Sequence, residues 1–235
     1  MPSRPTTVLV HSPFLGPTSL RPLAAALLRR GWPALVPDLR PGLVEPPVHQ
    51  RLARVFAEIV GTTAPRGELV LVGHSGAGPL LPGLAAAVDH VVPALVLLDA
   101  GLPTPGRPWS QDAPRELVEQ LRAAATDGRL PRWNRWFEVD PLAELIDDDA
   151  VRTRVAAELP EVPAVFLEEP RPDVSWPGRV GYLLLSTSAY GATAAAAHRR
   201  GWPVRHVASH HLAPTADPEP VADGLLDLLG ELLPV

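Results

Sequence analysis

The chain has 235 residues and a hydrophobic content of 46%, which is enough for one sizeable globular core and excludes a disordered protein. Its net charge of −5 is mild and its arginines form no basic stripe, so we expect neither nucleic acid nor a membrane as a partner. It contains no cysteine and no lysine. Disulfides, thiolate metal sites, cysteine nucleophiles and lysine Schiff bases are therefore excluded.

The N-terminal sequence resembles no targeting segment. Residues 1–5 lack the apolar centre of a signal peptide, and no apolar run in the chain reaches membrane-spanning length. We expect a cytoplasmic protein, either a monomer or a homodimer, that binds no cofactor and no metal ion. The acidic run 147–149 fits the start of a helix better than a calcium site, because it lacks the glycine and the spaced oxygens of a calcium loop.

The first part of the chain alternates between short apolar strands and amphipathic helices. Strands are predicted at 7–10 and 34–36, and each is followed by a helix with leucine, valine or alanine on one face, at about 18–30 and 52–61. Uninterrupted apolar strands that alternate with helices are typical of a parallel sheet with helices on its faces.

A third buried strand leads directly into a serine. The apolar residues 69–72 run into Gly73-His74-Ser75-Gly76-Ala77, and an alanine- and leucine-rich helix follows, in which Pro82 is expected to cause a kink. This is the context of a G-x-S-x-G nucleophile elbow, in which small residues allow a sharp turn that exposes the serine oxygen at a helix N-terminus. Here alanine replaces the last glycine. The alternative is an ordinary glycine–serine loop, but the strand before Ser75 and the helix after it favour a nucleophile.

The alternation stops after the next strand and resumes later. The strand 91–98 ends at Asp99, and the segment 105–176 then has weak strand signals and an amphipathic helix at 113–126. Strands are predicted again at 180–185 and 204–208, and the latter precedes His210, His211 and a final helix opened by Pro218. We interpret residues 1–104 and 177–235 as the core domain and 105–176 as a helical cap inserted into it.

A serine is a poor nucleophile unless a base accepts its proton and a third group orients that base. In an open parallel sheet, groups at the carboxyl ends of the strands converge on one crevice. The strand ends offer Ser75, then Asp99, then the histidine pair His210 and His211. Serine, acid and histidine in this chain order are typical of one particular fold family.

These residues resemble the α/β-hydrolase superfamily, in the branch with a small helical cap. The motifs that carry the resemblance are Val10-His11-Ser12-Pro13, Pro37-Asp38, Gly73-His74-Ser75-Gly76-Ala77 and the run from His211 to Pro218-Glu219. The resemblance implies an α/β-hydrolase fold with a mostly parallel sheet flanked by helices. It also selects His211 as the general base, because relatives place the base at this distance before the proline of the last helix. His210 is then a neighbour that lines the substrate pocket.

The acid departs from the commonest family pattern. Many relatives carry it after the strand that here ends in Ser186-Thr187-Ser188, where no carboxylate is present. A smaller set, including some haloalkane dehalogenases, carries the acid after the preceding strand, and Asp99 matches that position. We predict that Asp99 orients His211. The alternative is a turn residue at the start of the cap.

The oxyanion hole of the family needs two backbone donors. Gly76, after the nucleophile, can supply the first. The second donor of relatives corresponds to Pro13, which has no amide hydrogen. Either Phe14 supplies this donor through a shifted loop or the hole has one donor fewer, although Ser12 offers a hydroxyl in place of the usual glycine. We assign His11 a structural role.

The resemblance implies a serine hydrolase that cleaves an ester, lactone or thioester of a small to medium apolar molecule. Trp133, Trp136 and Phe137 of the cap either roof an apolar substrate pocket or form the core of the cap. Two alternatives stay open. Relatives with the same serine and histidine perform lyase, cyclase or other non-hydrolytic chemistry, and a non-catalytic ligand-binding protein can also use this scaffold.

Overall fold

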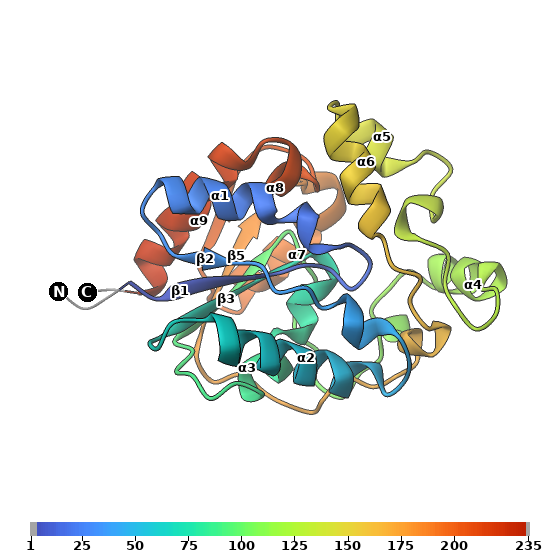
Figure 1. Cartoon of the computed structure of the whole chain (residues 1–235), viewed down its shortest axis with the longest axis horizontal. Helices are drawn as coiled ribbons and strands as arrows, with labels where there is room; N and C mark the ends of the chain where they lie inside the picture. The colour runs from blue at the N-terminus through green and yellow to red at the C-terminus, as the bar shows by residue number, and fades with distance from the viewer. Residues whose placement is uncertain (1–3, 234–235) are drawn as a thin grey trace.

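The computed structural model describes residues 4–233, in which one six-stranded parallel sheet forms the centre of the molecule (Figure 1). The strand order is β2-β1-β3-β4-β5-β6, and every neighbouring pair runs parallel. The strands are β1 (Thr6–Val10), β2 (Ala34–Leu35), β3 (Leu69–His74), β4 (Ala94–Leu98), β5 (Arg179–Leu184) and β6 (Val204–His206). The predicted α/β fold with a mostly parallel sheet is confirmed.

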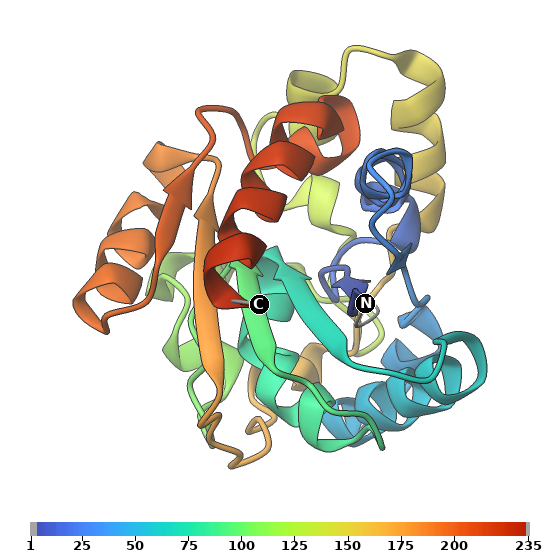
Figure 2. The same cartoon turned by 90° about the vertical axis from the view of Figure 1, so that its left-hand side faces the viewer.

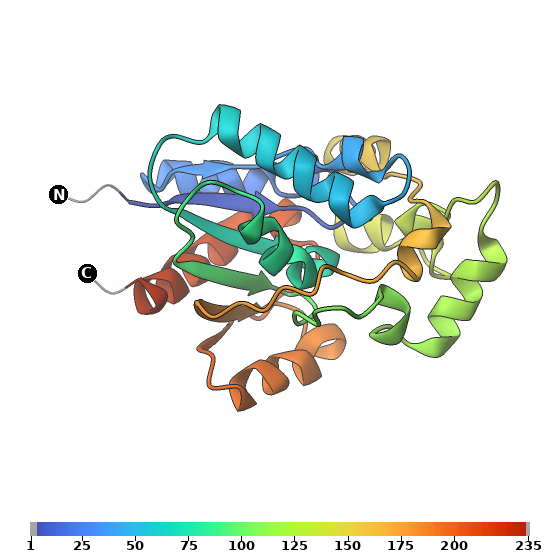
Figure 3. The ribbon, with the colours of Figure 1, turned by 90° about the horizontal axis from the view of Figure 1, so that it is seen from below.

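Helices cover both faces of this sheet. The helices of the core are α1 (Arg21–Arg29), α2 (Val48–Thr63), α3 (Leu81–Ala86), α7 (Thr187–Arg199), α8 (Ala213–Ala216) and α9 (Pro218–Leu232). Figure 2 shows α1 and α9 on one side of the twisted sheet and α2 on the other, and Figure 3 shows the face that α2, α3 and α7 cover. None of the described helices is both long enough and apolar enough to cross a bilayer.

The central strands are buried on both faces, because their sequences are mostly apolar without alternation. Every residue of β1, β3 and β4 is buried. Successive side chains of a strand point to opposite faces. Leu9 and Val96 therefore pack in the cluster with α1 and α9, whereas Val8 and Leu97 pack in the cluster with α2, α3 and α7. This packing fixes the register of the strands, and with it the positions of their carboxyl ends.

The turn after β3 is sharp and strained. Ser75 has a φ of 58°, and the chain then forms a 3-10 turn at Ser75–Leu80 before α3 begins. The sequence predicted a single helix with a kink at Pro82. Instead Pro79 lies in the 3-10 turn and Pro82 lies in the first turn of α3, where a missing amide hydrogen costs no hydrogen bond. A Cβ at Gly78 would lie 2.6 Å from the carbonyl oxygen of Gly101, so only glycine fits there.

Beyond the carboxyl ends of the strands lie the helices of the segment 105–176, at the end of the molecule opposite the C-terminal end of α9 (Figure 1). They are α4 (Arg115–Ala124), α5 (Pro141–Leu145), α6 (Asp149–Glu158) and 3-10 turns at Trp109–Gln111, Trp133–Arg135 and Ala164–Leu167. Within the acidic run, Asp148 is the N-cap of α6 and accepts hydrogen bonds from the amides of Ala150 and Val151. This is the helix start that the sequence predicted.

A small apolar cluster fastens this segment, the predicted cap, to the rest of the chain. Leu142 and Ile146 of the α5 region and Val155 and Leu159 of the α6 region pack against two core residues, Leu15 and Leu212. Leu212 directly follows His211. The cap is therefore anchored beside the histidine that the sequence predicts as the general base.

Candidate active site

The structure brings Ser75, His211 and Asp99 together although they lie after three different strands. The Nε2 atom of His211 is 3.0 Å from Ser75 Oγ, and its Nδ1 atom is 2.7 Å from Asp99 Oδ2. A carboxylate can only accept, so Nδ1 carries the proton and Nε2 directs its lone pair at the serine hydroxyl. This is the arrangement that a Ser-His-Asp triad requires.

Asp99 is held by more than the histidine. Its side chain is fully buried, and it has a φ of 44°, in the left-handed region that Asp tolerates better than most residues. Oδ1 accepts hydrogen bonds of 3.0 Å from the amides of Leu185 and Ser186, and Oδ2 accepts one of 2.5 Å from the Ser186 hydroxyl. Burial raises the pKa of Asp99, but the hydrogen bonds from His211 and Ser186 outweigh it and hold the pKa below its usual value. The group is therefore a carboxylate.

Ser186 lies just after β5, the strand after which many members of the resembled superfamily carry the acid. Its amide and hydroxyl face the Asp99 carboxylate from the end of β5. The neighbouring strand thus provides the donors that a buried carboxylate needs, while β4 provides the carboxylate itself. Behind it, the Tyr182 hydroxyl donates to the Ala100 carbonyl at 2.9 Å and accepts from the Ala100 amide at 3.2 Å. Both contacts fix the backbone that follows Asp99.

Two further histidines support the site from inside the protein. The Nε2 atom of His74 is 2.9 Å from the carbonyl oxygen of His211, and the two rings lie 4.6 Å apart. His11 lies 2.9 Å from the Ser12 carbonyl through Nδ1 and accepts the Leu39 amide through Nε2 at 3.0 Å. His11 therefore joins the loops after β1 and β2. Burial lowers the pKa of His11 and, together with the nearby His211, lowers the pKa of His74 to about 3.

The buried neutral His74 is expected to make the protein sensitive to acid. In the unfolded chain this imidazole has its ordinary pKa of 6.5, whereas in the folded protein its pKa is about 3. Between these values the unfolded chain takes up a proton that the native state does not bind, so stability falls as the pH decreases from 6.5 towards 3. In His74→Gln the melting temperature should depend less steeply on pH in this window. His198→Gln, at an exposed histidine of α7, is the matched control with an unchanged slope.

The loop after β1 lies directly against the elbow, beside Gly76. A Cβ at Gly76 would lie 3.1 Å from Ser12 Oγ, 3.4 Å from Pro13 Cδ and 3.5 Å from the Phe14 ring. The Phe14 amide donates to Ser12 Oγ at 3.3 Å, so the Ser12 hydroxyl accepts this bond and keeps its own proton for donation. Pro13 has no amide hydrogen. On this loop the Phe14 amide is thus engaged with Ser12 Oγ, and the Ser12 hydroxyl is the donor that lies beside Gly76.

A cleft of about 370 Å³ opens above Ser75 between the core and the cap. Trp133, Trp136 and Phe137 all line it, and so do Phe14 and Trp109. Trp136 is 4% exposed and its ring lies 4.6 Å from that of Phe14, so it also belongs to the packed interior. Phe137 is 49% exposed at the rim. Trp136 therefore both lines the cleft and packs in the interior, although the sequence offered these two roles as alternatives.

Part of the cleft lining is polar. Arg171, with a side chain only 4% exposed, forms an ion pair of 2.5 Å with Asp112 and donates to Thr104 Oγ1 at 2.5 Å. Both Arg171 and Asp112 line the cleft. Thr104 and Asp112 lie where the chain enters the segment 105–176, and Arg171 lies where the chain leaves it, so these contacts join the two ends of the segment. No local sequence pattern indicates these residues, because the pair forms across a separation of 59 residues.

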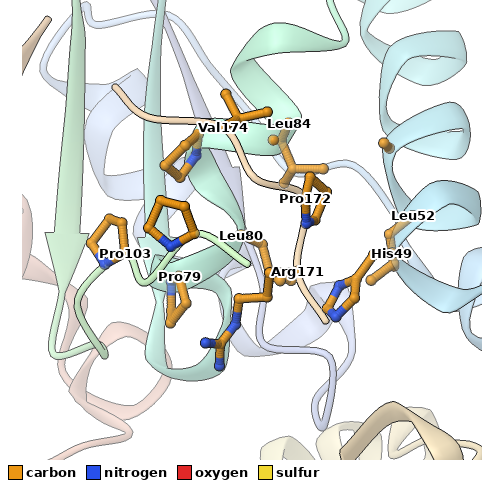
Figure 4. Close-up of a pocket in the computed structure, with 13 residues that line it drawn as sticks. His49, Leu52, Pro79, Leu80, Leu84, Pro103, Arg171, Pro172 and Val174 are labelled. Atoms are coloured by element: carbon orange, nitrogen blue, oxygen red, sulfur yellow. The ribbon is translucent and has the colours of Figure 1, made fainter. Parts of the chain in front are cut away.

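A second, much smaller cavity lies beside Arg171 (Figure 4). Pro79 and Arg171 line both this cavity and the cleft. The other lining residues are His49 and a set of mostly apolar residues that includes Pro172. Its volume of about 20 Å³ is sufficient for one water molecule and too small for a substrate.

The prediction that His210 lines the substrate pocket differs from the structure. His210 lines a separate surface cavity together with Asp147, Asp148 and Asp217, on the side of α5 and α6. The two adjacent histidines point apart because the backbone turns into the loop before α8, so that only His211 faces Ser75. Side-chain direction in such a loop does not follow from sequence spacing.

Tyr190 is a cleft residue that the sequence analysis missed. It lies in the first turn of α7, and its ring stacks on the imidazole of His211 with a centroid distance of 5.3 Å and an interplanar angle of 14°. Its position just after a strand end was a usable signal, because the first turn of a helix that follows a parallel strand borders the crevice. Trp109 gave a weaker signal, since it lies in the cap without a recognisable motif.

A parallel sheet with a serine at a strained strand-to-helix turn, and with acid and histidine at later strand ends, defines the α/β-hydrolase class. The sequence profile of the alpha/beta hydrolase family matches residues 7–224, and the chain belongs to this family. Among curated proteins no sequence matches it.

Solved structures show the same fold at low identity. An extracellular alpha/beta-hydrolase from a Paenibacillus species is 18% identical, with a TM-score of 0.75 over 95% of this chain and 98% of its own. A tomato methylketone synthase I variant in complex with β-ketoheptanoate is 13% identical, with a TM-score of 0.73 over 98% and 99%. Polyneuridine aldehyde esterase is 15% identical, with a TM-score of 0.72 over 97% and 100%.

Proposed function

We propose that this protein is a serine hydrolase that cleaves an ester, lactone or thioester of a small to medium apolar molecule. The observation that carries the proposal is the continuous contact from Ser75 Oγ through the His211 ring to the buried Asp99 carboxylate. An imidazole directed at the serine oxygen also argues against a purely ligand-binding role, which has no need of a positioned base.

The geometry supports an acyl-enzyme mechanism. Ser75 Oγ attacks the substrate carbonyl while His211 Nε2 accepts its proton, and Asp99 stabilises the imidazolium that forms. The Gly76 amide, with a donor from the loop after β1, stabilises the oxyanion. The imidazolium then protonates the leaving-group oxygen or sulfur as its bond to the carbonyl carbon breaks. Water, activated by the same histidine, hydrolyses the acyl-enzyme and restores Ser75.

The cleft supports an apolar substrate of limited size. A volume of about 370 Å³ is at the lower end of the range of small-molecule sites. The walls near Ser75 are the rings of Phe14, Trp109, Trp133 and Trp136, which contact acyl chains or rings favourably when water is displaced. Two of the structural neighbours are an esterase and a hydrolase by name, and both have this fold.

Covalent labelling tests this proposal directly. A fluorophosphonate probe should add its mass to the wild-type protein at Ser75, and the protein should hydrolyse p-nitrophenyl esters with the best kcat/KM at short to medium acyl chains. A panel of lactones and thioesters then identifies the bond that is cleaved. A folded protein with neither labelling nor turnover on any of these substrates would contradict the proposal.

A second candidate is non-hydrolytic chemistry in which Ser75 and His211 act as acid and base. The observation that favours it is Pro13, which has no amide hydrogen where relatives have the second oxyanion donor. A lyase that forms no tetrahedral acyl intermediate has less need of this donor. It predicts partial activity of Ser75→Ala on the true substrate and no acyl-enzyme in mass spectrometry.

Replacing Pro13 with alanine adds an amide hydrogen beside Gly76. If the site forms an oxyanion, kcat for ester hydrolysis should rise by about 10-fold or more, since one donor contributes on the order of 100-fold in such holes. Steady-state kinetics with a p-nitrophenyl ester measure the change. Pro65→Ala, at an exposed proline after α2, is the control for the loss of a proline and should leave kcat unchanged. An unchanged kcat in Pro13→Ala as well would mean that the oxyanion is stabilised elsewhere.

A further inference from the structure

The cleft beside Ser75 contains one charged pair among mostly apolar walls. Of the described residues that line it, Arg171 is the one cation and Asp112 the one anion. The Arg171 side chain is 4% exposed, so its guanidinium has little bulk water around it and needs other hydrogen-bond acceptors. A guanidinium carries five N–H donors, one on Nε and two on each of the terminal nitrogens.

The protein engages only one end of this guanidinium. The Nη1 atom donates to Asp112 Oδ2 and Thr104 Oγ1, at 2.5 Å each, and approaches the Arg107 carbonyl oxygen at 3.3 Å. Within residues 4–233, neither Nε nor Nη2 forms a hydrogen bond, and neither nitrogen is fully buried. The three N–H donors on these two nitrogens are therefore left for water or a ligand.

These donors are held in place at the cleft. In Figure 4 the Arg171 guanidinium points away from His49, a residue that lines the small cavity and not the cleft. Arg171 lines the cleft together with Ser75. The backbone amide of Arg171 also donates to the Arg107 carbonyl, at 3.3 Å, so both ends of the residue are fixed. The result is a positioned group of donors in a cleft whose other walls are largely aromatic.

We propose that Arg171 is a specificity-determining residue that binds an uncharged acceptor oxygen of the substrate, such as the oxygen of a ketone, an amide or an ether. This oxygen belongs to the part of the substrate remote from the bond that Ser75 attacks. The charges of Arg171 and Asp112 cancel, so the cleft lining offers no net positive charge to offset the desolvation of a carboxylate. The inference rests on the proposed hydrolase function.

The acceptor oxygen matters because an entirely apolar substrate displaces water from the Arg171 donors and leaves them unpaired. Matched p-nitrophenyl esters test this in the wild-type protein, with acyl chains that end in a methyl ketone or in an isopropyl group of nearly the same shape. We expect kcat/KM to be higher for the ketone by about 10-fold or more at the chain length that reaches Arg171. The mono-p-nitrophenyl ester of a dicarboxylic acid of that length should be a poorer substrate than the ketone, after subtraction of the uncatalysed rate.

Arg171→Lys tests the residue itself. Lysine keeps a cation for Asp112 but lacks the donors of Nε and Nη2. The ratio of kcat/KM for the ketone to that for the isopropyl ester should fall to about one. Turnover of the isopropyl ester should change little, because this substrate makes no hydrogen bond to Arg171. The wild-type ratio needs no variant, so it decides the proposal even if Arg171→Lys does not fold.

Arg122→Lys is the matched control, since Arg122 also forms an ion pair within the segment 105–176, with Glu168, but its side chain is 54% exposed. It should keep the wild-type ratio. Equal kcat/KM for ketone and isopropyl esters at every chain length, preference for the carboxylate, or an unchanged ratio in Arg171→Lys would overturn the role of Arg171. Fluorophosphonate labelling of Ser75 would then still support the hydrolase, whereas absence of labelling in the wild-type protein would overturn both proposals.

Discussion

Ser75→Ala is expected to lower kcat for ester hydrolysis by roughly 10⁶-fold, to the level that binding and oxyanion stabilisation provide without a nucleophile. The physical reason is that Ser75 Oγ is the atom in contact with His211 Nε2, at 3.0 Å, and alanine leaves the base without a proton to accept. Steady-state kinetics on the best p-nitrophenyl ester measure the loss, and intact-protein mass spectrometry should show that fluorophosphonate labelling disappears.

The control is a serine that lies outside the cleft. Ser188 is exposed in the first turn of α7, and Ser188→Ala should retain wild-type kcat and labelling. If Ser75→Ala kept a substantial fraction of the turnover on the physiological substrate, the acyl-enzyme mechanism would be excluded, and the non-hydrolytic alternative would become the better account. If Ser75→Ala lost the fluorophosphonate labelling but kept its turnover unchanged, the acyl-enzyme mechanism would likewise be excluded.

Asp99→Asn is expected to lower kcat by about 10⁴-fold with little change in KM. An asparagine in this position keeps its carbonyl oxygen towards the amides of Leu185 and Ser186, and it therefore directs its NH₂ group at His211 Nδ1. The imidazole is then no longer held in the tautomer whose Nε2 accepts the serine proton. The melting temperature should also fall, because the amides of Leu185 and Ser186 lose a charged acceptor.

The neighbouring strand offers a sharper version of this test. Ser186 Oγ lies 2.5 Å from Asp99 Oδ2, so a carboxylate at residue 186 is within reach of His211. The exchange variant Asp99→Ser with Ser186→Asp should regain part of the activity that Asp99→Ser alone loses. Asp99→Asn with kcat close to wild type would show that Asp99 is only a structural turn residue.

Much of the fold was predictable because its signals are local. Apolar runs of strand length, the elbow at Ser75 and the proline that opens α9 each depend on a few adjacent residues, and the observed strands and helices match those predictions to within a few residues. The kink predicted at Pro82 was wrong, because the choice between a 3-10 turn and an α-helix after Ser75 depends on packing against Ala100 and Gly101.

The sequence by itself determined the order serine, acid, histidine along the chain and the strand ends that bear them, because parallel strands bring their carboxyl ends to one edge. The tertiary structure decided which side chains meet there. It turned His211 towards Ser75 and His210 into another cavity, placed Ser186 and Tyr190 around the acid and the base, and joined Asp112 to Arg171 across the cap. These contacts depend on loop directions and on packing between segments far apart in the chain, which no local pattern encodes.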